Sequence, residues 1–196
     1  PGLAPEDFPP LPEYSEKPLL EFDSKILKEM IRKTFFSVSP DETRQALNGL
    51  LLEMDGDSAN LVGTDGHRLA MISRPVKSNA SKGEALSFLL PKKALSELLK
   101  LMEDEDATLG FSSQDNHLAF ICGKQVIVSR KIDGKFPNYR QVIPGDNQLK
   151  AKAGRNDLTH ALKRVALLAD EKSKMVRFEI GKGILTLISD NTDLGA

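Results

Sequence analysis

The segment GTDGHRLAMIS, residues 63–73, places an acid, a histidine and an arginine almost side by side. Residues of these types could catalyse hydrolysis, with His67 as the general base and Asp65 orienting its imidazole. On a continuous strand the two side chains would point the same way, but Asp65-Gly66 favours a turn. The sequence also contains no G-x-S-x-G or comparable nucleophile motif. Catalysis is therefore the interpretation that the residues favour least.

Two other interpretations of this segment stay open. One is a purely structural turn, in which the Asp65 carboxylate accepts hydrogen bonds from backbone amides. Such a turn explains Asp65 and Gly66, but not why His67 and Arg68 begin the next strand beside apolar Leu69. The other is one wall of a binding groove, because such grooves combine an apolar floor with a few oriented polar groups.

The histidines and the cysteine give no sign of a metal or redox site. His67, His117 and His160 are scattered singly, without H-x-x-x-H or comparable spacing, so we expect neither a metal nor a cofactor. The single cysteine, Cys122, excludes an internal disulfide framework and is typical of a reducing cytosol. We therefore expect a cytoplasmic protein in which Cys122 is a buried, unreactive thiol.

The composition is that of an ordinary globular protein. Of the 196 residues, 40% are hydrophobic and 28% charged, and the longest apolar runs are too short to span a bilayer. The 27 basic and 28 acidic side chains give a net charge of −1. This balance argues against a surface that is positive all over, but it allows one basic face. We expect no membrane association, and no secretion signal opens the chain.

The beginning of the chain predicts a linker followed by a strand and a helix. Residues 1–18 contain six prolines, which is typical of a linker or extended arm. A short strand is expected at 19–23, and a helix at 25–36 with Ser24 as its N-cap. Because the chain begins with Pro1 rather than methionine, we expect it to be a piece of a longer protein.

The next segments predict antiparallel strands and a second helix. Strands at 49–54 and 60–63 flank the Asp55-Gly56-Asp57 hairpin turn. Pro91 is expected to open the second helix, at 92–104. Further strands are expected at 68–74, 85–91, 107–112, 117–123 and 125–132. Helical spacing predicts one buried stripe on each helix: Leu27, Met30, Ile31, Thr34 and Phe35 on the first, and Leu95, Leu98, Leu99 and Met102 on the second.

After residue 144 the pattern starts again. A strand at 150–154, a helix from 155 and two strands joined by Gly-Lys-Gly follow the same order, which indicates a repeat of about 130 residues. We therefore expect an α+β protein of repeated domains, each with two helices packed on antiparallel β-sheet. Residues 19–144 would be one complete domain, and 145–196 the N-terminal half of the next.

The predicted helices share a division of charge. Basic residues lie off the apolar stripe on each helix: Lys25, Lys28 and Arg32, then Lys92, Lys93 and Lys100, then His160, Lys163 and Arg164. Solvation of an exposed face is the simpler explanation for each helix alone. Segregation of basic residues in a chain of net charge −1, however, suits a protein that meets phosphates on one side. Since no aromatic residues interleave with the lysines, contact with a duplex backbone is favoured over stacking on single strands.

Several motifs together resemble the sliding-clamp family, the beta subunit of bacterial DNA polymerase III. They are TDGHRLA, LLPKKALSELLKLM, SRKIDGKFPNYRQVIP and ALKRVALLADEK, and the similarity runs from about residue 6 to the end. The resemblance implies the DNA-clamp fold, with residues 1–18 as the end of a first domain, a complete second domain and a truncated third. It also implies a non-catalytic accessory subunit, which catalogues can file under DNA-directed DNA polymerase.

For DNA, the resemblance implies a ring of two protomers, joined head to tail, that encircles double-stranded DNA without reading its sequence. Helices line the hole of such a ring. The residues expected to face DNA are Lys25, Lys28, Arg32, Lys92, Lys93, Lys100, Lys163 and Arg164. Since one domain is missing and another incomplete, we expect this chain by itself not to close a ring.

For protein partners, the resemblance implies a groove that receives linear peptides from the replicative polymerase alpha subunit, the clamp loader and repair polymerases. The matching positions are Arg44, Leu47, Thr64, Gly66, His67, Arg68, Leu69, Pro137, Gln141 and Val142. Gln141 and Ser173 depart from the residues common in the family at these places, and the remaining wall is expected in a segment beyond residue 196. The alternative is a peptide-binding α+β module without a DNA role.

Overall fold

The computed structural model describes residues 12–81, 86–102, 107–145, 147–169 and 175–189, and the chain forms two compact units, Pro1–Val142 and Ile143–Ala196. We call these unit 1 and unit 2 and describe each by itself. Within the described ranges, no helix is both long and apolar enough to cross a membrane.

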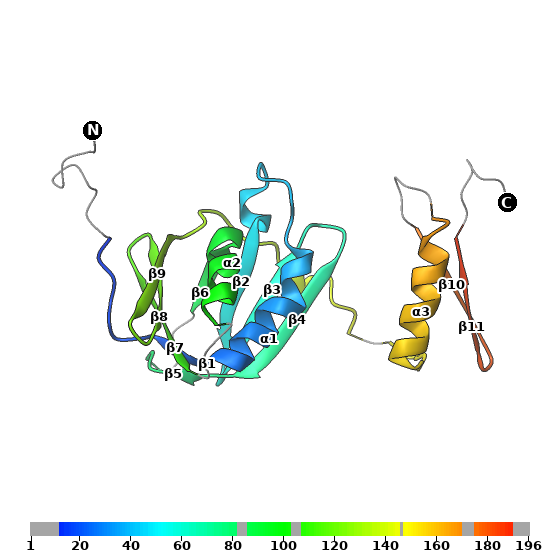
Figure 1. The fold of residues 1–196 in the computed structure, drawn as a ribbon, viewed down its shortest axis with the longest axis horizontal. Helices are drawn as coiled ribbons and strands as arrows, with labels where there is room; N and C mark the ends of the chain where they lie inside the picture. The colour runs from blue at the N-terminus through cyan, green and yellow to red at the C-terminus, as the bar shows by residue number, and fades with distance from the viewer. Residues whose placement is uncertain (1–11, 82–85, 103–106, 146, 170–174, 190–196) are drawn as a thin grey trace. The chain divides into compact units, whose positions relative to one another are not determined.

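Unit 1 contains two antiparallel sheets (Figure 1). The first has the order β5-β1-β7-β8-β9, with bounds Lys77–Ser78, Leu20–Asp23, Thr108–Gln114, His117–Cys122 and Gln125–Arg130. The second has the order β4-β3-β2-β6, with bounds Leu69–Pro75, Ser58–Thr64, Gly49–Asp55 and Ser87–Pro91. The sequence pattern predicted antiparallel sheet but not its division in two, because the division depends on β1 pairing with the distant β5 and β7.

Helix α1, Ser24–Thr34, begins directly after β1. The prediction that Ser24 is the N-cap is wrong: Asp23 is the cap, and its Oδ1 accepts hydrogen bonds from the backbone N–H of Lys25 at 2.8 Å and of Ile26 at 3.3 Å. Ser24 is instead buried, and its Oγ accepts a hydrogen bond from the Ala107 N–H at 3.2 Å. Both residue types cap well, and tertiary contact with the segment before β7 decided between them.

Helix α2, Lys92–Leu101, ends earlier than expected, and part of the predicted extension lies outside the described residues. Pro91 closes β6 and is the N-cap residue of α2 rather than its first helical residue. The two helices lie side by side in Figure 1 and bury most of the predicted stripes. Two predicted residues are only partly buried: Leu99 of α2, and Phe35, which begins a 3₁₀ turn, η2 (Phe35–Ser37).

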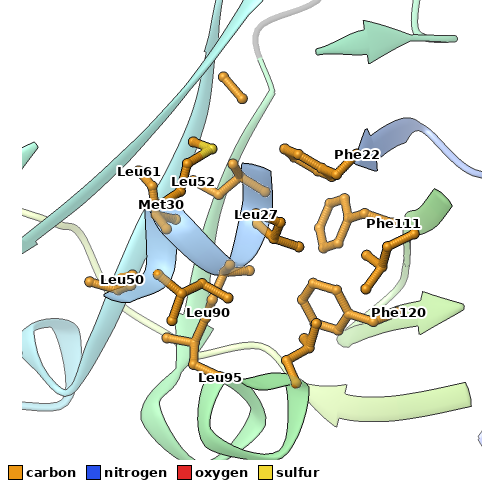
Figure 2. Packing of buried hydrophobic residues seen from close by; sticks show 14 of the residues in the cluster. Phe22, Leu27, Met30, Leu50, Leu52, Leu61, Leu90, Leu95, Phe111 and Phe120 are labelled. Carbon is orange, nitrogen blue, oxygen red and sulfur yellow. The ribbon is translucent and has the colours of Figure 1, made fainter. Parts of the chain in front are cut away.

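The main hydrophobic core joins the two helices to both sheets. Figure 2 shows α1 contributing Leu27 and Met30 between side chains of the two sheets. Phe111 of β7 contacts Phe120 of β8 and Phe88 of β6, each with ring centroids 5.1 Å apart. Because Phe88 belongs to the second sheet, these rings connect the two sheets directly. Cys122 is buried in the same core, as expected.

Unit 2 contains α3, Arg155–Ala166, and the antiparallel pair β10, Arg177–Gly181, and β11, Ile184–Ile188. The predicted strand at 150–154 is absent, and this segment has no regular structure. In unit 1 the corresponding strand, β1, is held between β5 and β7. Among the described residues of unit 2, β10 and β11 pair only with each other, and residues 150–154 pair with neither strand.

Candidate functional site

The turn between β3 and β4 is organised by Asp65. Its Oδ1 accepts hydrogen bonds from the backbone N–H of His67 at 2.9 Å and of Arg68 at 3.0 Å. Its Oδ2 accepts a third from Nε of Arg68, also at 3.0 Å. The carboxylate therefore bonds the backbone of His67 and not its imidazole, so the arrangement needed for general-base catalysis is not formed here.

Thr64 and Gly66 complete the turn. The Thr64 hydroxyl donates to the carbonyl of Arg68 at 2.7 Å and accepts from the N–H of Gly66 at 3.1 Å. Gly66 has φ of +91°, a conformation that glycine adopts without steric cost. These bonds fix where His67 and Arg68 leave the turn. The prediction that Asp65-Gly66 forms a turn, with the Asp65 carboxylate accepting backbone amides, is therefore confirmed.

Partial burial of the Asp65 side chain raises the pKa of its carboxyl, but the hydrogen bonds from His67 and Arg68 outweigh this effect. The pKa of Asp65 is therefore lowered from its ordinary value. The carboxylate is ionised at neutral pH and holds the Arg68 guanidinium, which also lies over the Phe36 ring at 5.6 Å from its centroid.

A groove of about 350 Å³ opens beside this turn. Its lining comes from the turn and β4 on one side and from the segment after β9 on the other. The lining residues are Thr64, Gly66, His67, Arg68, Leu69, Pro137, Asn138, Tyr139 and Val142. Most of the positions that the resemblance indicated therefore lie together, although they are separated by about seventy residues of chain.

The other predicted groove residues lie near this lining without forming it. Arg44 reaches the turn, where its Nη1 donates to the carbonyl of Asp65 at 3.4 Å. Leu47, at the end of the 3₁₀ turn η3 (Gln45–Leu47), packs against a second core cluster beneath the groove. Gln141 is exposed at the end of another 3₁₀ turn, η4 (Tyr139–Gln141). Ser173 lies outside the described residues.

Asn138 and Tyr139 line the groove but were not among the predicted positions. Tyr139 is 3% exposed and belongs to the second core cluster, together with Leu51, Val62, Leu89 and Phe136. Its hydroxyl donates to Oε1 of Glu53 at 2.6 Å. An aromatic residue directly after Phe-Pro-Asn is the one signal in the sequence that could have indicated this buried contact.

The predicted DNA-facing residues of unit 1 lie on the outer faces of α1 and α2. Lys25, Arg32, Lys93 and Lys100 are exposed, and Lys28 and Lys92 are half-buried. Nζ of Lys28 donates to the carbonyl of Met102 at 3.1 Å, which holds this lysine between the helices. Acids accompany the basic residues, because Lys100 pairs with Glu97 at 2.9 Å and Lys33 with Glu29 at 2.5 Å.

In unit 2, Lys163 and Arg164 are exposed in the last turn of α3. Cations are favoured there, because they oppose the partial negative charge of the carboxyl end of the helix. Among the residues that the structure describes, no group of three histidine, cysteine or acidic side chains is arranged to hold a metal ion.

Helices with basic outer faces on antiparallel sheet, beside a groove with a partly apolar lining, define an α+β domain with a candidate binding groove. Two family models then match in chain order: the central domain of the DNA polymerase III beta subunit over residues 21–138, and its C-terminal domain over residues 140–196. The chain belongs to the family of DNA polymerase III beta subunits, the beta sliding clamps.

Individual relatives agree with this assignment. The beta sliding clamp of Chlamydia pneumoniae is 36% identical over 191 residues, which is 97% of this chain and 51% of that protein. The solved DNA polymerase III subunit beta of Pseudomonas aeruginosa superposes with a TM-score of 0.86 at 30% identity, over 97% of this chain and 52% of that one. A sliding clamp from Bartonella birtlesii, solved bound to griselimycin, gives 0.87 at 31% identity, over 97% and 52%. The chain thus spans about half the length of these relatives.

Proposed function

We propose that this chain is part of a processivity factor that, in its full-length polypeptide, encircles duplex DNA as a homodimeric ring. The factor tethers the replicative polymerase alpha subunit, the clamp loader and repair polymerases, and it works in the cytoplasm without catalysing a reaction itself. The observation that carries this proposal is the match of two successive clamp domains, in order, along nearly the whole chain.

Within that proposal, residues 1–18 end a first domain, residues 19–144 are the complete central domain, and residues 145–196 begin the C-terminal one. The compact unit that ends at Val142 and the family match over 21–138 support a boundary in this region.

The outer faces of the helices support the DNA part of the proposal. Exposed lysine and arginine side chains attract phosphates without reading bases, and such contacts are weak and sensitive to salt. Acids such as Glu29 and Glu97 among these residues moderate the attraction. A ring that must slide needs this balance, since a topological link rather than tight adhesion holds it on DNA.

Charge reversal tests the DNA part. In the full-length protein, we expect Lys28, Arg32, Lys163 and Arg164 changed together to Glu to shorten retention on nicked circular DNA, measured by gel filtration after loading. A matched control reverses the same number of exposed lysines outside the predicted face: Lys17, Lys124, Lys152 and Lys182. If both variants are retained like the wild type, the ring does not use these helix faces and the DNA assignment is wrong.

The groove supports the partner part of the proposal, because its lining joins apolar Leu69, Pro137 and Val142 to polar groups of the turn. We expect His67→Ala to weaken binding of a fluorescein-labelled peptide carrying the clamp-binding motif of the replicative polymerase, measured by anisotropy. Ring closure, which sedimentation measures, should not change. The control is His117→Ala, which lies in the first sheet away from the groove. Equal affinity in both variants would contradict the assignment of the groove.

A further inference from the structure

The Glu53 carboxylate on β2 bonds two residues of η4, the turn that forms one wall of the groove. Oε1 of Glu53 accepts the hydrogen bond from the Tyr139 hydroxyl at 2.6 Å and lies 2.5 Å from Nη2 of Arg140. The Glu53 side chain is only 14% exposed. The Arg140 guanidinium also lies over the Tyr139 ring, 5.2 Å from its centroid. Glu53 therefore fixes two successive residues of η4 at one point of the sheet.

The segment that Glu53 holds has little structure of its own. The turn η4 has no side-chain cap, and its backbone hydrogen bonds, Gln141 N–H to Asn138 and Val142 N–H to Tyr139, are 3.3 and 3.2 Å long. A single 3₁₀ turn has poor hydrogen-bond geometry and is marginal by itself. Its position must therefore come from tertiary contacts.

Two kinds of contact are available to the segment. Apolar packing of Tyr139 and Phe136 against the second core cluster holds the segment down, but such packing is non-directional. The charge-assisted bonds to Glu53 are short and directional, and they determine how far along β2 the turn sits. Asp55 adds little, because it lies 3.4 Å from Arg140 and is 68% exposed.

We infer that Glu53 is a positioning residue for the groove, acting through Tyr139 and Arg140. Glu53 lines a neighbouring pocket of about 560 Å³ and not the groove itself, whereas Pro137 and Val142, on either side of η4, line the groove. A peptide in the groove need not touch Glu53 for Glu53 to set the wall against which the peptide binds. This inference rests on the proposed function of the groove.

The test separates affinity from stability in the full-length protein. We expect Glu53→Gln to weaken binding of the labelled polymerase peptide roughly three- to tenfold. This variant keeps an acceptor for the Tyr139 hydroxyl but loses the charge that holds Arg140. Tyr139→Phe should do the same. Asp55→Asn is the matched control and should leave affinity unchanged. Leu98→Ala, in the main core, should lower the melting temperature without changing affinity, because Leu98 belongs to the other cluster.

A second measurement needs no ligand. Amide hydrogen exchange at Gln141 and Val142 should be faster in Glu53→Gln than in the wild type or in Asp55→Asn, since these N–H groups close η4. Unchanged exchange together with unchanged affinity would overturn the inference while leaving the groove assignment intact. Loss of affinity in proportion to the fall in melting temperature would also overturn it. If the wild type does not bind the peptide, the proposed function fails first, and the inference fails with it.

Discussion

Asp65 and Arg68 face each other across the β3–β4 turn, with Nε of Arg68 3.0 Å from Oδ2 of Asp65. The same carboxylate accepts the backbone N–H groups of His67 and Arg68. One side chain therefore shapes the turn and also aims the cation that it presents to the groove. Asp65 and His67, which resembled a catalytic pair in the sequence, are instead joined through the backbone of a turn that lines the groove.

Removing the Asp65 carboxylate should reduce peptide binding in the groove more than it reduces the stability of the fold. In Asp65→Ala, two backbone N–H groups lose their acceptor and Arg68 loses its partner, so we expect peptide affinity to fall at least fivefold. Asp65→Asn keeps an amide oxygen for the backbone and should retain more affinity. Anisotropy titration of both variants checks this order, and equal affinities in the two variants would mean that the backbone hydrogen bonds to residue 65 do not matter for binding.

The same carboxylate should make the turn sensitive to acid. Because the folded-state pKa of Asp65 is below its ordinary value of 3.8, the ionised group stabilises the fold fully above that value. This stabilisation is lost as the pH falls through the lower, folded-state pKa. Urea unfolding of wild type and Asp65→Asn between pH 5 and pH 2 should show the two free energies converging. A difference independent of pH would contradict this assignment.

Gly66 should tolerate substitution poorly although it is exposed. At φ of +91° an alanine is strained, and we expect Gly66→Ala to cost roughly 1–2 kcal/mol of unfolding free energy. Space is not the reason, because the nearest atom to an added Cβ, Nη1 of Arg44, would lie at an ordinary 3.6 Å. Gly145→Ala is the control, since nothing lies near it and its φ is not positive. Equal costs in urea unfolding would refute the conformational explanation.

The Tyr139 hydroxyl should lose its proton at a higher pH than an ordinary tyrosine. Burial, with the hydrogen bond and charge of Glu53, raises its pKa to about 12. The stabilisation linked to the neutral phenol is complete below the unfolded-state pKa of 10, and it declines as the pH rises through about 12. Tyrosinate absorbance in a Tyr14→Phe background should therefore show a midpoint near 12, with circular dichroism confirming that the chain is still folded. A midpoint near 10 in folded protein would contradict burial of the hydroxyl.

Leu98 should be among the most costly core positions. It is 0% exposed between α2 and the sheets, so Leu98→Ala should lower the unfolding free energy by about 2–5 kcal/mol. Leu149, which is 95% exposed, provides the matched control. Leu149→Ala should change the unfolding free energy by less than about 0.5 kcal/mol. Urea unfolding followed by circular dichroism measures both. Comparable effects would mean that the helix does not form the core as described.

The sequence determined most of the local elements of unit 1. Spacing placed Leu27, Met30 and Ile31 on a buried helical face, and the Asp-Gly turns marked both hairpin corners of the second sheet. These predictions succeeded because periodicity and turn chemistry act over a few residues. The groove positions came from resemblance to a family, not from spacing. That the groove binds partner peptides stays a prediction.

Tertiary structure decided what depends on residues distant in the chain. It chose Asp23 over Ser24 as the cap, because Ser24 is engaged by Ala107. It left residues 150–154 without a strand, since a strand needs a neighbour that local sequence does not reveal. It also joined Glu53 to Tyr139 across 86 positions of chain. Short-range patterns fix the elements, whereas the bonds that set the shape of the groove form only once the sheets have folded.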